Sequence, residues 1–196
     1  MCDTNAVSKM VYKAPELIQE LVDYGVGFTR KGDQLDLGKE GGHSENRIVH
    51  AADATGREVE NVLAKRVKNH PNIDVFEYFF AMELLTEHHL GKKVKYLPEI
   101  HCFGVYALNC KEGIVETFLA KKTVLATGGI GEVYAYTTNP TIATGDGIAM
   151  AYRAKAHIQH MEFVQFHPTT LQIPEADSYL ITEALRGFGA ILRNSS

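Results

Sequence analysis

The stretch that decides the expected fold reads Val124-Leu125-Ala126-Thr127-Gly128-Gly129. A short apolar run that ends in paired glycines is typical of a buried strand that leads to a cofactor in α/β folds. Glycine also lets the backbone turn sharply and come close to a ligand. We therefore expect a buried strand over residues 124–127 and a ligand beside the glycines that follow it.

A second glycine-containing stretch follows and reads Thr144-Gly145-Asp146-Gly147-Ile148-Ala149-Met150-Ala151. Its spacing predicts a helix from Gly145 to about Ala156, with an apolar side made of Ile148, Ala149, Tyr152 and Ala156. Asp146 is expected to cap this helix with its carboxylate. A helix start is also a favourable place for an anionic group of a cofactor.

The remaining patterns predict a mixed order of helices and strands. Helices are expected over residues 7–24, ended by Gly25, and from Thr55 to about Asn69, where Thr55 and Glu58 form a capping-box pattern. The paired glycines of Glu40-Gly41-Gly42-His43-Ser44 indicate a loop. Strands are expected over residues 73–85, 100–108, 114–119 and 163–167, and one helical turn over residues 183–186.

The composition is that of a globular protein without a polyanionic partner. Of the 196 residues, 45% are hydrophobic and 22% are charged, which is ordinary for a folded domain. Lys plus Arg is 20 and Asp plus Glu is 24, so the net charge of −4 does not favour nucleic acid. The apolar runs are short, and residues 1–20 lack the apolar stretch of a signal peptide. We expect no membrane span and a cytoplasmic location.

The three cysteines do not indicate a disulfide framework. Cys2, Cys102 and Cys110 are an odd number without a C-x-x-C pair, which fits a reducing compartment. The alternative is a zinc site, whose ligands would come from His88, His89, His101, Cys102 and Cys110. These residues lie on separate expected elements and lack paired ligand spacing, so we expect no metal.

Three ordered stretches together resemble the flavoprotein family that contains succinate dehydrogenase, fumarate reductase and L-aspartate oxidase. The first consists of the two glycine-containing stretches above. The second is Glu162-Phe163-Val164-Gln165-Phe166-His167-Pro168-Thr169, and the third is Thr182-Glu183-Ala184-Leu185-Arg186-Gly187. Their order and spacing make the match specific. The resemblance implies FAD as the cofactor.

Two upstream stretches are similar to the L-aspartate oxidase branch of this family. They are Glu40-Gly41-Gly42-His43-Ser44 and His50-Ala51-Ala52-Asp53-Ala54-Thr55-Gly56-Arg57. Members that act on succinate or fumarate usually carry Phe before the paired glycines, whereas this chain has Glu40. Among these substrates only aspartate carries an ammonium group, and a carboxylate would pair with it. The resemblance therefore implies oxidation of L-aspartate to iminoaspartate.

The resemblance also implies roles for individual residues. Substrate binding is implied for Glu40, Gln165, His167 and Thr182, through a carboxylate, an amide, an imidazole and a hydroxyl. Flavin contacts are implied for Phe80, Ala81, Ala126, Thr127, Gly128, Gly129 and Asp146. Glu183 and Arg186 match a proton relay of fumarate-reducing relatives, and the alternative is a simple surface ion pair. The alternative for His167 is a buried structural histidine.

The expected fold is α/β (mixed), with a partial Rossmann-like flavin-binding domain over residues 1–160 and the start of a capping domain over residues 161–196. The G-x-G-x-x-G loop that opens complete flavoproteins of this type does not occur. We therefore expect an internal fragment. The implied partners of the complete enzyme are oxygen or fumarate as electron acceptor and quinolinate synthase, which would use the product on the route to NAD.

Two other interpretations stay open. One is the flavoprotein subunit of a succinate dehydrogenase or fumarate reductase, from which Glu40 and Thr170 distinguish this chain. The other is a non-catalytic remnant or an incomplete gene model.

The absent glycine loop predicts that the isolated chain binds FAD poorly and does not oxidise L-aspartate, because the amides that hold the pyrophosphate are missing. The measurement is a visible absorption spectrum of the purified chain. A stoichiometric yellow chromophore that L-aspartate bleaches would contradict the prediction.

Overall fold

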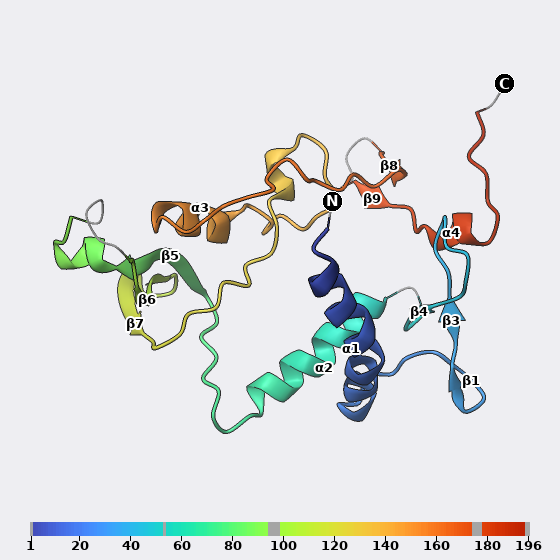
Figure 1. The fold of residues 1–196 in the computed structure, drawn as a ribbon, viewed down its shortest axis with the longest axis horizontal. Helices are drawn as coiled ribbons and strands as arrows, with labels where there is room; N and C mark the ends of the chain where they lie inside the picture. Colours follow the sequence, from blue (N-terminus) through green and yellow to red (C-terminus); the bar gives the residue numbers. More distant parts are fainter. Residues whose placement is uncertain (1, 53, 94–98, 174–177, 195–196) are drawn as a thin grey trace. The chain divides into compact units, whose positions relative to one another are not determined.

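The computed structural model describes residues 2–52, 54–93, 99–173 and 178–194. They form two compact units, residues 1–75 with 182–196 and residues 76–181, whose helices and strands are labelled in Figure 1. Asp53, in one of the stretches that resemble the L-aspartate oxidase branch, lies outside the described residues. The boundary near residue 160 between a flavin domain and a capping domain stays a prediction.

The first unit begins with helix α1, Thr4–Asp23. Asp3 starts this helix, because its carboxylate accepts hydrogen bonds from the main-chain N–H groups of Asn5 at 2.9 Å and Ala6 at 3.2 Å. This cap explains why the helix begins before the predicted start at Val7. Gly25, at φ +101°, follows the last turn as predicted.

Helix α2, Thr55–Lys68, has the predicted extent but not the predicted cap. Thr55 Oγ1 accepts a hydrogen bond from the Ala51 N–H at 3.0 Å, and Glu58 Oε1 accepts one from the Gly27 N–H at 3.1 Å. The predicted capping box is wrong, because both side chains bond to preceding segments instead. The Glu58 bond ties the segment that follows α1 to α2, beside the buried side chains of Val26 and Phe28.

Short antiparallel ladders connect the helices of this unit. They are formed by β1, Arg30–Lys31, with β2, Gln34–Leu35, and by β3, Leu37–Gly38, with β4, Ile48–Val49. The predicted glycine loop at residues 40–44 connects β3 to β4. A single helical turn, α4, Ala184–Gly187, is found where one turn was predicted.

The second unit contains a three-stranded antiparallel sheet in the order β5-β6-β7. Its strands are Phe79–Thr86, Cys102–Asn109 and Ile114–Leu119. The predicted antiparallel pair over residues 100–108 and 114–119 is confirmed. The strand predicted from residue 73 begins only at Phe79, because residues 73–78 have no place in the ladder.

Helix α3, Asp146–Arg153, packs beside β5 in this unit (Figure 1). Its buried residues are Gly147 and Met150, so the predicted apolar side is wrong, and Tyr152 is 68% exposed. The reason is that Arg153 sets the orientation of the helix. Its Nε lies 2.5 Å from Glu83 Oε2, and its Nη2 donates to the Met82 carbonyl at 2.8 Å.

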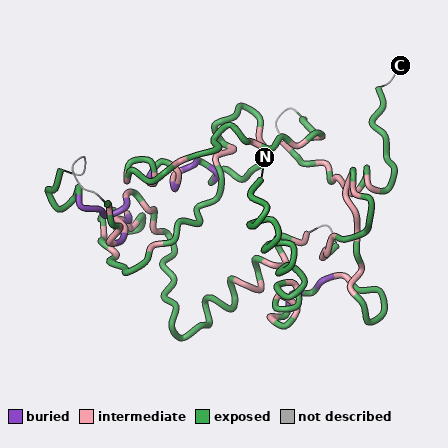
Figure 2. Tube along the Cα trace, in the orientation of Figure 1, coloured by how far each residue is buried: buried purple, intermediate pink, exposed green. Residues whose placement is uncertain are grey.

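The buried residues are few and gathered in small clusters. Figure 2 shows them on β5, on β6 and at the start of α3, with a smaller group between α1 and β1. The second unit contributes the apolar side chains of Leu84, Leu85, Ala107, Ala143 and Met150. The core is therefore built around the contact of α3 with the sheet, which also places the glycine-containing stretches.

A buried carboxylate stands at the end of β5, in the 3-10 turn η1, Glu87–Leu90. Burial raises the pKa of the Glu87 carboxyl, but hydrogen bonds from the His101 main-chain and ring N–H groups outweigh it and bring the pKa below its usual value. His101 is therefore the hydrogen-bond partner of the Glu87 carboxylate. Among the described residues, no group of three or more His, Cys, Asp or Glu side chains is placed to hold a metal ion.

Two predicted strands are not formed. Residues 124–127 and 163–167 have no ladder partner within the described ranges, and an extended segment becomes a strand only through such a partner. Val124 is 85% exposed, so the expectation of a buried strand is wrong. The other elements of this unit are the 3-10 turn η3, Gly131–Val133, and the pair β8, Thr170–Leu171, with β9, Tyr179–Leu180.

None of the helices in the described part of the chain combines the length and the apolar character that crossing a bilayer requires.

Replacing Gly104 by Ala is expected to destabilise the sheet by about 2–4 kcal/mol. Gly104 has φ +146°, and a Cβ atom there would lie 1.9 Å from the Phe118 carbonyl oxygen of β7. The matched control is Gly113→Ala, which also has a positive φ but meets nothing within 4 Å and should cost about 1 kcal/mol. Urea unfolding followed by circular dichroism gives both values. Equal losses would refute the steric explanation.

Candidate functional site

The loop that carries Glu40 is held in a tight turn. The His43 N–H donates to the Glu40 carbonyl at 3.2 Å, and Gly42 has φ +85°. Gly42 is the third residue of this four-residue turn. A type II turn requires a positive φ at that position, and therefore favours glycine. The geometry of this turn therefore explains why glycine occurs in the loop that the sequence predicted.

The same loop lies directly against α4. A Cβ atom on Gly187 would be 2.3 Å from the Lys39 carbonyl oxygen, and one on Gly41 would be 3.4 Å from Arg186 Cβ. The approach of α4 to Lys39 is possible only because residue 187 is glycine, whereas a Cβ atom on Gly41 would make an ordinary van der Waals contact. It places the predicted substrate residue Glu40 next to the segment that carries Thr182, Glu183 and Arg186.

Glu40 and Thr182 line one cavity of about 260 Å³ in the first unit. Its wall also contains His50, Thr55 and Phe188. Glu40 Oε2 is buried and has no hydrogen-bond partner among the described residues. A buried carboxylate oxygen without a donor is rare and costly in native proteins. The arrangement indicates a site that a cationic or hydrogen-bonding group of a ligand would complete.

The predicted relay residues form a close ion pair at the edge of this site. Arg186 Nη2 lies 2.6 Å from Glu183 Oε1, and the two side chains are 42% and 31% exposed. Exposure of this degree fits a surface ion pair as well as a relay, so the geometry leaves both interpretations open. Thr182 Oγ1 accepts the Ala184 N–H at 3.3 Å, which fixes the start of α4.

Gln165 and His167 lie in the second unit, on the wall of a cavity of about 490 Å³. Tyr134, Tyr136 and Asn139 line the same cavity. His167 Nδ1 lies 2.8 Å from the Thr169 carbonyl oxygen and 3.2 Å from the Thr169 main-chain nitrogen. The imidazole is therefore fixed by a local turn. The structure brings Glu40 together with Thr182, and Gln165 together with His167, each pair within its own unit.

Of the residues predicted to contact the flavin, Thr127 and Gly129 lie against the start of α3, where Asp146 is the first helical residue. A Cβ atom on Gly147 would lie 2.0 Å from Thr127 Oγ1, and the Gly145 N–H donates to the Gly129 carbonyl at 3.1 Å. Residues 127–129 thus lie against the first turn of the helix. This agrees with the expected neighbourhood of the two glycine-containing stretches, although the segment before Gly128 is not a strand.

Asp146 is not the cap that was predicted. Gly145 is the N-cap, without a side-chain hydrogen bond to the first amides of α3. The Asp146 carboxylate instead accepts the Thr144 hydroxyl at 2.6 Å, and Asp146 is the first helical residue rather than the N-cap. The N-cap residue therefore offers no side-chain acceptor to the first amides of α3, although Gly147 is buried.

This region fits a dinucleotide. Gly128 has φ +76°, and a Cβ atom on Gly128 or Gly129 would meet nothing within 4 Å, so open space lies beside this backbone. Phe80 and Ala81 belong to β5, an edge strand of the sheet, where they pair with Leu108 and Ala107. An edge strand has main-chain groups free for a ligand. The open backbone at Gly128 and Gly129 and the edge position of Phe80 and Ala81 therefore fit the expected flavin contacts, which stay predictions.

The sequence interpretation assigned no role to three residues that the structure places at these sites. They are His43, His50 and Arg153. His43 and His50 belong to the stretches that resemble the L-aspartate oxidase branch, and this membership could have pointed to them. Their side-chain partners could not be predicted, because those partners depend on the turn geometry. No sequence pattern indicated that Arg153 would orient α3.

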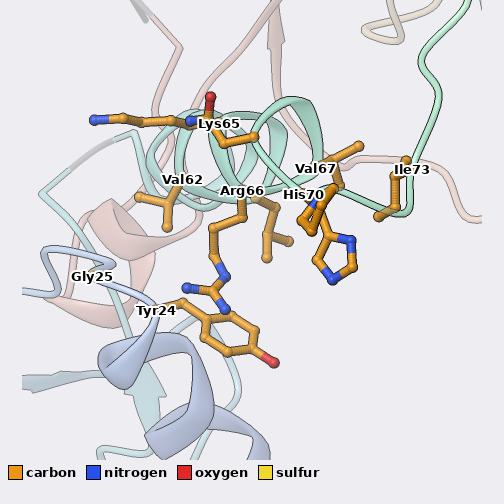
Figure 3. Close-up of a pocket in the computed structure, with 11 residues that line it drawn as sticks. Tyr24, Gly25, Val62, Lys65, Arg66, Val67, His70 and Ile73 are labelled. Carbon is orange, nitrogen blue, oxygen red and sulfur yellow. The ribbon is translucent and has the colours of Figure 1, made fainter.

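A larger cavity of about 790 Å³ in the first unit contains none of the predicted residues. It lies beside the second half of α2 and the end of α1 (Figure 3). The Arg66 guanidinium lies over the Tyr24 ring at 3.9 Å, and the figure shows the two side chains facing each other. This stacking connects α1 with α2. The cavity beside it is therefore explained by the packing of these helices.

Replacing Gly187 by Ala is expected to push the Glu40 loop away from α4 and to cost about 1–3 kcal/mol. The matched control is Gly56→Ala in α2, where a Cβ atom meets nothing within 4 Å. Amide hydrogen exchange over residues 38–43 should increase in the first variant and stay unchanged in the second. Unchanged exchange in Gly187→Ala would contradict the packing of the loop on α4.

The chain is similar in sequence to known proteins over almost its whole length. The sequence is 50% identical to L-aspartate oxidase 1 of Ralstonia nicotianae, covering 98% of this chain and 36% of that protein. It is 48% identical to the chloroplastic L-aspartate oxidase of Arabidopsis thaliana, covering 99% of this chain and 30% of that protein. The chain thus spans about a third of the length of these relatives.

Solved structures confirm the fold class. The E. coli quinol fumarate reductase structure with the FrdA E245Q mutation matches with a TM-score of 0.84 and 32% identity, over 98% of this chain and 31% of that chain. Sdh1 of Mycobacterium smegmatis matches with a TM-score of 0.71 and 33% identity, over 94% of this chain and 31% of that chain. The mixed α/β fold and the resemblance to this flavoprotein family are both confirmed.

The family itself is shown by a match that extends over residues 1–196. That family is described as the FAD binding domain, in agreement with the open backbone at Gly128 and Gly129 and the uncapped start of α3. The chain therefore belongs to the FAD binding domain family, and its cofactor is FAD.

Proposed function

We propose that this chain belongs to an FAD-dependent L-aspartate oxidase, which converts L-aspartate to iminoaspartate. The observation that carries the proposal is the Glu40 carboxylate, whose Oε2 is buried without a partner among the described residues. It lines a cavity with the hydroxyl-bearing Thr182. The curated relatives at 50% and 48% identity are named L-aspartate oxidases.

Charge complementarity explains the choice of substrate. L-aspartate, succinate and fumarate all carry two carboxylates, but only aspartate carries an ammonium group. The buried Glu40 oxygen would accept hydrogen bonds from that ammonium and form a short charge-assisted pair. Succinate offers no donor, so the carboxylate would stay unpaired at a cost of several kilocalories per mole. A site of this kind discriminates by leaving the wrong ligand unsatisfied.

The other residues of the site would orient the substrate. Thr182 contributes a hydroxyl donor for a substrate carboxylate, and Gln165 and His167 contribute an amide and an imidazole N–H. A cavity of about 260 Å³ at Glu40 suits a ligand of amino-acid size. Each of these groups would restrict the orientation of the substrate group that it binds, and orientation is a large part of catalysis in hydride transfer.

The chemistry removes two electrons from the substrate amine. The bond from Cα to hydrogen breaks with its electron pair, and an N–H proton leaves as the C=N bond forms, after the ammonium has lost one proton. FAD supplies the hydride acceptor when it is bound. Glu183 and Arg186, 2.6 Å apart, are proposed to move protons between the site and solvent.

The flavin would be held mainly by main chain. We propose contacts from Ala126, Thr127, Gly128 and Gly129, from Asp146 at the start of α3, and from Phe80 and Ala81 on the edge strand. The open space beside Gly128 and the uncapped amides of α3 support this arrangement. Side-chain chemistry is not required at these positions, because close backbone approach provides the binding.

The metabolic setting of the complete enzyme is a further part of the proposal. Oxygen or fumarate would reoxidise the flavin, and quinolinate synthase would consume iminoaspartate on the route to quinolinate and NAD, in the cytoplasm. The relatives named L-aspartate oxidase support this chemistry, and the three cysteines, which indicate no disulfide framework, support the cytoplasm.

Replacing Glu40 by Gln in the complete enzyme is expected to lower kcat/KM for L-aspartate by about 10- to 100-fold, because a hydrogen bond to a charged group contributes roughly 1.5–3 kcal/mol. Glu40→Phe should lose more and should bind succinate better. The matched control is Glu60→Gln on the exposed side of α2. Steady-state kinetics with both substrates give the comparison. A loss in Glu40→Gln no greater than in Glu60→Gln would sink the assignment.

A further inference from the structure

We propose that His43 is a positioning residue that holds the Glu40 carboxylate in the cavity. The inference rests on the proposed role of Glu40 as the partner of the substrate ammonium. The Glu40 main-chain N–H donates to His43 Nδ1 at 3.3 Å. The His43 main-chain N–H donates back to the Glu40 carbonyl at 3.2 Å. Both main-chain polar groups of Glu40 are therefore engaged by one residue.

The geometry determines the protonation of the imidazole. A main-chain N–H can only donate, so His43 Nδ1 must carry the lone pair. The ring proton of the neutral imidazole is then on Nε2. His43 is only partly exposed, and its ring is directed back onto the turn that Gly42 makes possible. The tautomer is a specific and measurable consequence of the contact.

The Glu40 side chain needs to be held in the cavity because burying its carboxylate there is energetically unfavourable. A carboxylate oxygen buried without a donor is unfavourable until a ligand arrives, so a free loop would swing it into solvent. The reciprocal bonds with His43 and the contact of Gly41 with Arg186 oppose this movement. A site prepared in this way loses less ordering entropy when it binds. His43 would thus act on affinity through Glu40, without touching the substrate.

A second example of the same bond occurs at Thr86 and His89, which line none of the three cavities described above. The Thr86 main-chain N–H donates to His89 Nδ1 at 3.2 Å, in a capping box that begins η1. Residue 86 is a threonine, which carries no ionised group that needs positioning. His89 therefore provides a matched control, since its removal breaks an equivalent hydrogen bond at a position where only local stability should change.

The conservative variant follows from the geometry of the side chains. In asparagine, Oδ1 is attached to Cγ just as Nδ1 is in histidine, so His43→Asn keeps an acceptor for the Glu40 N–H. His43→Leu removes it while keeping the bulk. A positioning role predicts rescue by Asn, whereas a role of the ring itself predicts equal losses in both variants.

The experiment uses the whole 196-residue chain, labelled with ¹⁵N and ¹³C. Long-range ¹H–¹⁵N spectra report the tautomer of each histidine, and the His43→Asn variant identifies the His43 signals. Titration with L-aspartate, followed at the Glu40 side-chain carboxyl carbon, gives Kd for the wild-type chain, His43→Asn, His43→Leu and His89→Leu. Succinate is the comparison ligand.

The expected result is a His43 ring protonated on Nε2. His43→Leu should weaken L-aspartate binding about five- to tenfold, the effect of one lost hydrogen bond. His43→Asn should stay within about twofold of wild type, as should His89→Leu, because an acceptor is kept in the first and the second lies outside the site. Succinate binding should not weaken in any of these variants, since succinate offers no donor to Glu40.

Each contrary result would overturn a different part of the proposal. A proton on His43 Nδ1, or signals typical of an unfolded chain, overturns the positioning contact. Unchanged binding in His43→Leu, or an equal loss in His89→Leu, overturns its role in affinity. Failure of the wild-type chain to prefer L-aspartate over succinate counts against the proposed function of Glu40, and the His43 contact is then judged by its tautomer alone.

Discussion

Main-chain segments of this protein approach each other more closely than any side chain would allow, and both candidate sites depend on these approaches. Gly187 brings α4 against the carbonyl of Lys39, and Gly147 brings α3 against the Thr127 hydroxyl. A Cβ atom at either position would lie within 2.3 Å of the neighbouring oxygen. Glycine removes this obstacle. The constraint explains why glycines occur where helix turns meet the loops that carry the proposed ligand contacts.

The Glu40 cavity shows how a binding site can be specific at the expense of stability. A carboxylate oxygen buried without a donor disfavours the unliganded state, and the surrounding turn must hold it against that cost. Gly42 allows the turn, His43 engages the main chain of Glu40, and the packing of Gly41 on Arg186 supports it from the other side. In the proposed function, the energy recovered when Glu40 pairs with an ammonium group would disfavour ligands that lack one.

The flavin region relies on the main chain in a different way. Gly145 rather than Asp146 caps α3, so the N-cap offers no side-chain acceptor to the first amides of the helix, and the Asp146 carboxylate bonds to Thr144. Arg153 fixes the other end of the helix to Glu83 and Met82 of β5. The position of the helix start relative to Gly128 and Gly129 thus depends on a charged contact made by the last residue of the helix, Arg153.

The sequence by itself determined the family, the cofactor and most elements whose residues stabilise them locally. Helix α2, the strands β6 and β7 and the glycine loop all formed as expected, because their periodicity, turn residues and neighbouring partners lie close together in the chain. The strands expected at residues 124–127 and 163–167 did not form, because a strand depends on a partner elsewhere in the chain. Only the tertiary structure decided which donors and acceptors meet. It moved Thr55 and Glu58 out of their capping box, placed Glu40 beside Thr182, and turned His43 onto the Glu40 amide, because these contacts join residues whose distance in space no sequence spacing specifies.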